Sequence, residues 1–295
     1  INYMAQILNA MIVISNLVSL FTKAHASMNR VSALFDTRSS MDEGGDAAFD
    51  FSAPAFELRD VCFSYAGTKQ YSLTDVTLCV PAGATVGVIG GTGSGKTTLV
   101  SLLPRLYDAG EGSVRVFGHD VREYPVRALR ALIGTVPQNT ALFSGTVRSN
   151  LCWGNEGATD AELEEALRAA CAYDFVAEKG GLDQKVTEGG KNFSGGQRQR
   201  LTIARALAAR PRILVLDDSC SALDFRTDAQ VRANIAALED VTTVIISQRA
   251  ASLQNADVIY VLEDGRVVGS GTHAQLYEGC PLYREICDSQ ARAEE

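Results

Sequence analysis

The strongest constraint on this chain is a glycine-rich stretch at residues 90–97 that fits the pattern G-x-x-x-x-G-K-[ST]. It follows an apolar run at 85–89, predicted to be a buried strand, and precedes a run of helical composition. In this context glycines let backbone N–H groups converge on phosphate oxygens, and the helix N-terminus adds a favourable dipole. The residues predicted to hold a nucleotide here are Gly90, Gly91, Thr92, Gly93, Ser94, Gly95, Lys96, Thr97 and Thr98.

Two side chains of this loop and two later aspartates supply the chemistry that a magnesium nucleotide needs. Lys96 provides a positive charge for the β- and γ-phosphates, and the Thr97 hydroxyl is a ligand for Mg²⁺. A second apolar run, at 213–216, ends in Asp217 and Asp218, and α/β sheets bind ligands at the carboxyl ends of their strands. We expect Asp217 to complete the Mg²⁺ shell, and Asp218 to stand where a water-activating base is needed.

A second anion site is predicted before the helix that begins near Ser194. Ser194 and Gln197 form an S-x-x-Q capping box, which places Gly195 and Gly196 in the first helical turn. Unpaired N–H groups in such a turn attract an anion. Two phosphate sites and one nucleotide loop per chain indicate that ATP is sandwiched across a dimer interface.

Composition excludes several classes of protein. With 295 residues, 46% of them hydrophobic and 21% charged, the chain is expected to be a packed globular protein. Its net charge of −8 argues against a nucleic-acid partner. Seven cysteines and three scattered histidines, with no C-x-x-C pair, favour a reducing compartment over disulfides or a histidine metal site.

The first 21 residues are uncharged and mostly apolar. A helix of that length measures about 31 Å, roughly one hydrocarbon core. Its amides fall within an arc of about 80°, which suits a membrane helix with one side turned to other helices or to water. These amides are Asn2, Gln6, Asn9 and Asn16, and the positive charges expected on a cytoplasmic flank are Lys23, Arg30 and Arg38. The alternative is a buried helix of a soluble domain.

Further along, the pattern predicts one α/β domain without an internal repeat. Residues 39–55 are turn-rich and acidic, which predicts a linker. A capping box at Thr159 and Glu162 predicts a helix that ends near Cys171. Apolar runs in the last third predict buried parallel strands separated by helices. The predicted strands are 56–65, 73–80, 85–89, 114–117, 213–216, 243–246 and 258–262.

In combination these motifs resemble the ATP-binding cassette (ABC) family over residues 56–283. The signature of that family is similar to residues 193–197, although Phe193 replaces the usual leucine. Residues 63–65 resemble the aromatic loop, which implies that Tyr65 stacks on adenine. Residues 136–138 resemble the Q-loop, which implies that Gln138 touches Mg²⁺ or the attacking water. Residues 221–224 resemble the D-loop, which crosses to the partner cassette.

The resemblance implies a P-loop NTPase (RecA-like) core with an antiparallel β-subdomain and an inserted α-helical subdomain at about 139–195. The nucleotide-binding domain would span 56–290. Residues 142–146 and 188–192 resemble exporter cassettes, in which six membrane helices precede the cassette. Residues 1–38 would then be the end of the last transmembrane helix and its cytoplasmic extension, so the chain is expected to be part of a longer one.

The same resemblance implies the setting in which the domain works. Its cofactors would be ATP and Mg²⁺. It would lie in the cell (inner or plasma) membrane, with the nucleotide-binding domain on the cytoplasmic side. Its partners would be a second ABC half-transporter, the lipid membrane, and a transported small molecule, lipid or peptide.

Two departures from the family pattern concern hydrolysis. The family has a catalytic glutamate where this chain has Asp218, and a switch histidine where it has Gln248. The shorter carboxylate retreats by about 1.5 Å, and a misplacement of that order costs roughly a hundredfold in rate. Glutamine can bond a γ-phosphate but carries no charge, and losing an acid–base group costs about 10²–10⁴. We therefore predict that Asp218, Gln248 and Gln138 form a hydrolysis-impaired site.

A heterodimer is the arrangement favoured by these departures. The intact signature of this chain would complete a competent site on a partner that carries glutamate and histidine. The alternatives are a slow homodimeric exporter, a soluble ABC ATPase without a transport role, and a purely regulatory nucleotide-binding subunit. An importer is disfavoured, since those cassettes usually lack a fused membrane segment. Cys220, Cys152 and Trp153 are interpreted as packing residues, and His273 is given no catalytic role.

Overall fold

The computed structural model describes residues 2–37, 39, 41–68, 70–219 and 223–294. Residues 292–294 are described by their backbone alone. The chain divides into two compact units, Ile1–Asp42 and Glu43–Glu295.

The first unit is built on one helix, α1 (Asn2–Asp36), which is 35 residues long. None of its described residues is buried. An 18-residue window has a mean hydropathy of 1.7, so α1 is long and apolar enough to cross a membrane. The predicted apolar N-terminal helix is present.

The second unit is centred on a six-stranded sheet with the strand order β12-β11-β3-β10-β9-β6. Five strands pair in parallel, and β12 is antiparallel to β11. The strands predicted at 85–89, 213–216, 243–246 and 258–262 are confirmed as β3, β9, β10 and β11. The strand bounds are β3 Thr85–Gly90, β6 Ile133–Val136, β9 Ile213–Asp217, β10 Thr242–Ile246, β11 Val258–Glu263 and β12 Arg266–Gly271.

A four-stranded antiparallel sheet, in the order β2-β1-β4-β5, forms the β-subdomain. Alternate residues of β2 are buried, as expected of a strand with one face on a core. The strands predicted from 56 and 73 are confirmed, whereas the strand predicted at 114–117 starts three residues earlier. The bounds are β1 Phe56–Phe63, β2 Leu73–Val80, β4 Glu111–Val116 and β5 His119–Asp120.

Most of the stretch predicted as a linker lies against this β-subdomain. The backbone N–H of Asp50 donates to the carbonyl of Phe117 over 3.0 Å. The Phe49 ring stacks on Tyr124 with 4.2 Å between ring centroids. The aromatic residues of the stretch give it apolar area to bury, which its acidic, turn-rich composition does not reveal.

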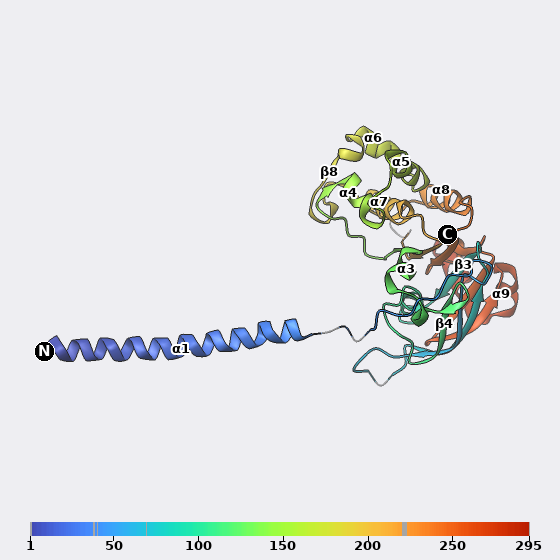
Figure 1. The fold of residues 1–295 in the computed structure, drawn as a ribbon. Coiled ribbons are helices and arrows are strands. Elements are labelled where there is room, and N and C mark those ends of the chain that lie inside the picture. The colour runs from blue at the N-terminus through green and yellow to red at the C-terminus, as the bar shows by residue number, and fades with distance from the viewer. Residues whose placement is uncertain (1, 38, 40, 69, 220–222, 295) are drawn as a thin grey trace. The chain divides into compact units, whose positions relative to one another are not determined.

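Helices and short strands between residues 145 and 208 form the helical subdomain, which Figure 1 shows at one end of the unit. The capping box of Thr159 and Glu162 is confirmed at the start of α5, and Cys171 follows the helix with a left-handed φ of +52°. The bounds are β7 Gly145–Thr146, α4 Val147–Leu151, α5 Asp160–Ala169, α6 Tyr173–Glu178, β8 Lys185–Val186 and α7 Gly195–Ala208.

Trp153 corrects one prediction about this subdomain. Its side chain is 67% exposed rather than packed inside, and its ring stacks on Phe143 at 4.3 Å. Cys152, in contrast, is half-buried against the core of the subdomain. Trp153 lies in the 3₁₀ turn η2 (Cys152–Gly154), and a turn of three residues places consecutive side chains in different directions.

The remaining helices surround the two sheets. Their bounds are α2 Lys96–Ser101, α3 Val126–Ala131, α8 Phe225–Ala236, α9 His273–Gly279 and α10 Pro281–Glu294. The other 3₁₀ turns are η1 Val121–Glu123, η3 Gly181–Asp183, η4 Glu188–Gly190 and η5 Ala250–Leu253.

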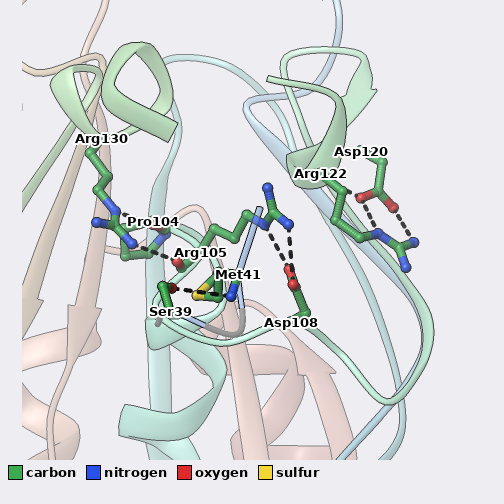
Figure 2. A network of polar contacts seen from close by, with 8 residues as sticks. All are labelled: Ser39, Met41, Pro104, Arg105, Asp108, Asp120, Arg122 and Arg130. Atoms are coloured by element: carbon green, nitrogen blue, oxygen red, sulfur yellow. Dashed lines mark hydrogen bonds and ion pairs between the residues drawn. The ribbon is translucent and has the colours of Figure 1, made fainter. Parts of the chain in front are cut away.

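Arginine contacts fix the segment that follows α2. Arg105 is 2% exposed, and its Nε donates to Asp108 over 2.7 Å. Arg130, on α3, donates to the carbonyls of Pro104 and Arg105 over 3.0 and 2.8 Å (Figure 2). The same view shows Arg122 bound to Asp120. The C-terminal side of α2 is therefore tied to α3 by charge-assisted hydrogen bonds.

Candidate nucleotide-binding site

The glycine-rich loop joins β3 to α2, as predicted. Gly95, the residue before α2, has a left-handed φ of +98°, and a Cβ there would lie 2.7 Å from the carbonyl oxygen of Ser72. A Cβ at Gly91 or Gly93 would instead meet nothing within 4 Å. The loop thus packs against the rest of the protein at Gly95, and it leaves open space beside Gly91 and Gly93, where a phosphate would approach.

Lys96 lies inside this loop and is 8% exposed. Its Nζ donates to the carbonyls of Gly90 and Gly91 over 2.9 and 2.7 Å, and to Ser94 Oγ over 3.3 Å. Burial lowers the pKa of the Lys96 amine, and the charges of Asp217 and Asp218 oppose that change. The loop therefore holds one buried cation beside its open face.

Thr97 and Asp217 lie together where a metal ligand set was predicted. Thr97 Oγ1 donates to Asp217 Oδ2 over 2.9 Å, and Asp217 is the last residue of β9. Burial raises the pKa of Asp217, whereas the Thr97 hydrogen bond and Lys96 lower it. A hydroxyl and one carboxylate fit Mg²⁺, which usually takes its remaining ligands from phosphates and water. In the described residues no cluster of three or more His, Cys, Asp and Glu side chains forms a metal site.

Asp218, Gln138 and Gln248 meet at a single oxygen. Asp218 Oδ2 lies 3.3 Å from Gln138 Nε2 and 3.5 Å from Gln248 Nε2. The residues follow β9, β6 and β10, and the parallel register pairs Ile246 with Asp217 and Val136 with Leu216. Three neighbouring strands thus bring the predicted catalytic residues together at the carboxyl edge of the sheet.

Tyr65 lies beside the loop, at the edge of the β-subdomain. Its hydroxyl is hydrogen-bonded to Thr98 Oγ1 over 3.0 Å, and its ring packs edge-on against Phe63 and Tyr107. Tyr65, Lys96 and Thr97 line a hollow of about 510 Å³. The structure therefore brings Tyr65 and the glycine-rich loop to one cavity.

The predicted capping box at the start of α7 is confirmed. Ser194 Oγ accepts from the Gln197 N–H over 3.3 Å, and Gln197 Oε1 accepts from the Ser194 N–H over 3.1 Å. Phe193 is buried against Phe175, which explains why an apolar residue stands there. Of the four predicted residues Ser194, Gly195, Gly196 and Gln197, Gly195 lines a different hollow of about 460 Å³, which shares no lining residue with the hollow beside the loop.

A family model described as ABC transporter matches residues 73–221. The chain belongs to the ABC transporter family.

Individual relatives agree with this assignment. An uncharacterised ABC transporter ATP-binding protein of Mycobacterium tuberculosis is 41% identical, over 99% of this chain and 51% of the relative. An ATP-dependent lipid A-core flippase of Yersinia pestis is 38% identical, over 92% of this chain and 47% of the relative. A solved bacterial Atm1-family ABC exporter with ATP bound matches with a TM-score of 0.85 and 33% identity, over 92% of this chain and 48% of that one. The chain spans about half the length of these relatives.

Membership in the ABC family confirms the predicted fold class, the α/β P-loop core of an ABC ATP-binding domain. One expected ABC motif, the D-loop, is described only in part. Cys220 and the D-loop residues Ser221 and Ala222 lie outside the described residues, whereas Asp224 caps α8 by accepting from the Thr227 N–H over 3.0 Å.

The sequence patterns did not indicate two residues that lie beside the ABC motifs in the structure. Tyr107 completes the aromatic group around Tyr65, and Gln290 on α10 bonds the backbone at Gln248. No ABC motif covers either position. Gln290 could have been noticed as a polar residue at helical spacing from Tyr283 and Ile286, which pack on the core.

Proposed function

We propose that this chain is the ATP-binding half of an ABC exporter subunit, which binds Mg-ATP at its own loop but hydrolyses it poorly. Its signature residues would complete the competent site of a partner subunit. The family match and the likeness to an exporter solved with ATP support the coarse function. The geometry of the loop and of the Asp218 cluster supports the residue roles that the family resemblance implies.

In this proposal the loop and its neighbours hold the nucleotide. Lys96 contacts the β- and γ-phosphates, the open side of Gly91 and Gly93 admits them, and Tyr65 stacks on adenine. Thr97 and Asp217 would hold Mg²⁺, with Gln138 as a further ligand. When bound, Mg²⁺ supplies positive charge against the phosphates.

The observation that carries the weak-hydrolysis proposal is the shared oxygen of Asp218. Its carboxylate is contacted by two amides, of Gln138 and Gln248. A glutamine at 248 carries no charge at any physiological pH, so it cannot act as the switch histidine does. The aspartate is also one methylene shorter than the usual glutamate. Both differences affect hydrolysis and leave Lys96 unchanged.

The wider assembly is proposed from α1 and from the length of the relatives. Residues 1–38 would be the end of a membrane helix and its extension, 39–55 the connection, and 56–290 the nucleotide-binding domain, with a helical subdomain at about 139–195. The exposed apolar surface of α1 supports a membrane location. The cassette would face the cytoplasm, and a second half-transporter with glutamate and histidine at the two altered positions would complete a heterodimer.

The test compares ATP binding and hydrolysis by the full-length protein in lipid nanodiscs. We expect the wild-type homodimer to bind Mg-ATP and turn it over slowly. The double variant Asp218→Glu, Gln248→His should then raise turnover on the order of a hundredfold without changing ATP affinity. Lys96→Ala is the control that loses binding.

Rapid turnover by the wild-type homodimer that Asp218→Ala leaves unchanged would contradict weak hydrolysis. Copurification from the native membrane tests the assembly. A partner with glutamate and histidine at the corresponding positions supports the heterodimer, whereas isolation of a homodimer alone contradicts it.

A further inference from the structure

The backbone that carries Gln248 is held from two sides. On the side of the sheet, the Ser247 N–H donates to the carbonyl of Val88 in β3 over 3.2 Å. On the other side, the carboxamide of Gln290 makes two bonds: Oε1 accepts from the Ala250 N–H over 2.9 Å, and Nε2 donates to the Gln248 carbonyl over 2.6 Å. One amide therefore fixes two backbone groups that flank Arg249.

The helix that carries Gln290 is itself firmly placed. Tyr283 is fully buried, and its hydroxyl lies 2.8 Å from Nδ1 of His273 on α9. Ile286 and Cys287 pack against the core of the unit. Gln290 is seven residues after Tyr283 and four after Ile286, so it lies on the same face of α10. The carboxamide is thus presented to the loop by a packed helix.

The Gln248 side chain points from this backbone to the Asp218 cluster, where its Nε2 lies 3.5 Å from Asp218 Oδ2. In a loop, the direction in which a side chain points depends on the φ and ψ angles of its own backbone. Removing the Gln290 bonds would leave the Gln248 carbonyl and the Ala250 N–H to find other partners, and the side chain would lose its fixed direction.

We propose that Gln290 is a positioning residue of the nucleotide site, because it holds the backbone of Gln248 and Ala250 and so directs the Gln248 amide to the γ-phosphate. The inference rests on the proposed function, in which Gln248 occupies the switch position. It makes α10 part of the apparatus that distinguishes ATP from ADP, although no described side chain of α10 lines the hollow beside the loop.

The test uses the full-length protein in nanodiscs and calorimetric titration with Mg-AMP-PNP and Mg-ADP. Gln290→Leu keeps the size of the side chain and removes both bonds. We expect it to lower the preference for AMP-PNP over ADP by about two- to tenfold, the range that corresponds to one hydrogen bond. ADP affinity should stay unchanged, and hydrogen exchange at the Ala250 amide should become faster.

Two control variants separate positioning from a general disturbance. Ser289→Ala alters the neighbouring residue, whose hydroxyl bonds the Ile286 carbonyl within α10. Gln254→Leu makes the same chemical change at an exposed glutamine beside η5. Neither should change the preference. Gln290→Glu keeps the acceptor for the Ala250 N–H but sets a carboxylate oxygen against the Gln248 carbonyl, so it should also lower the preference, and it serves if the leucine variant does not fold.

A double-mutant cycle completes the design. In a Gln248→Ala background, Gln290→Leu should have no further effect on the preference. An equal effect in both backgrounds, an unchanged preference in folded Gln290→Leu or Gln290→Glu, or an equal loss in either control would overturn the inference. Failure of the wild-type protein to bind either nucleotide would instead overturn the proposed function, and this inference with it.

Discussion

Asp218 has a left-handed backbone, with a φ of +46°, and its N–H donates to the carbonyl of Ile246 over 2.9 Å. Aspartate and asparagine tolerate this conformation better than alanine does, because their short polar side chains bond locally. The residue thus has a backbone role in addition to the chemical role proposed for its carboxylate, and substitutions there test two properties at once.

We predict that Asp218→Ala lowers the free energy of unfolding by about 1 kcal/mol more than Asp218→Asn does. The two variants lack the same negative charge, so the difference isolates backbone strain. Thermal unfolding of the full-length protein measures it. Equal midpoints for the two variants would show that the left-handed backbone costs alanine nothing at this position.

Thr97 offers a test of the metal ligand set. Thr97→Val keeps the shape of the side chain and removes the hydroxyl that bonds Asp217. We expect ATP affinity in Mg²⁺ to fall about tenfold, a loss typical of one bond to a charged group, and to become similar to the affinity in EDTA. Ser101→Ala, on the same helix, is the matched control, since its hydroxyl bonds the Thr98 carbonyl within the helix. An undiminished effect of Mg²⁺ in Thr97→Val would refute the assignment.

Asp217 predicts how stability depends on pH. Burial raises its pKa in the folded chain, so the folded state binds the proton more tightly than the unfolded state does. The stability that protonated Asp217 contributes is therefore present below its ordinary pKa of 3.8, and it is lost as the pH rises through the higher pKa of the folded state. We expect Asp217→Asn to raise the unfolding midpoint at pH 7 without Mg²⁺, and to give no gain below pH 4. A gain that persists at low pH would contradict this.

At the scale of elements, α2 depends on contacts at both of its ends. Its first residue, Lys96, belongs to the loop, and the segment after it is held by Arg130 through the carbonyls of Pro104 and Arg105 (Figure 2). Two hydrogen bonds from a guanidinium to backbone oxygens fix geometry more than they add stability when the arginine is partly exposed.

We predict that Arg130→Met lowers the free energy of unfolding by about 1 kcal/mol. Arg127→Met makes the same change at an exposed position of the same helix and should be neutral. Thermal unfolding of both variants provides the comparison. If both lose the same stability, then loss of positive charge, rather than loss of these two bonds, is the cause.

Local patterns predicted elements well where one residue fixes the backbone. The capping boxes at Thr159 and Ser194 gave helix starts that the structure confirms, and the parallel strands β3, β9, β10 and β11 were predicted within one residue, whereas β6 was not predicted. The β-subdomain packing of Phe49 was not predictable, because its partner Tyr124 lies 75 residues away and neither position carries a motif. Gln290 was not predicted because no motif marks its own position, although its partner Gln248 lies at a predicted one.

At the scale of the whole molecule, the chain has two candidate anion sites that do not share a cavity. The loop residues line one hollow, and Gly195 lines another. The capping box predicted a second anion site, separate in sequence from the first, but the sequence could not give the partner that would bring a second cassette to Gly195. The sequence predicted Asp218, Gln138 and Gln248 as members of one site. That both amides lie beside one oxygen of Asp218 could be seen only once the register of the sheet was known.

We predict that Gly195→Asp separates the two sites. A Cβ there meets nothing within 4 Å, and an acidic residue suits the first turn of a helix, so the variant should fold. Its negative charge should repel a phosphate, lowering the ATPase rate of the assembled dimer more than tenfold, a loss of about 1.4 kcal/mol. ATP binding at the Lys96 loop should be unchanged. Gly157→Asp, at an exposed glycine of the same subdomain, is the control. An unaltered ATPase rate in Gly195→Asp would contradict the role of the signature.

The strands β6, β9 and β10 end beside one another in the sheet, and this affects how the site of such a subunit can change in evolution. Because β6 pairs with β9 and β9 with β10 in parallel, the sheet register sets where residues 138, 218 and 248 meet. Under the proposed function, a lineage would silence or restore this site mainly by exchanging the side chains at 218 and 248, within the limits that the left-handed backbone of residue 218 sets. The scaffold of a working site would then persist in a subunit whose own site hydrolyses slowly.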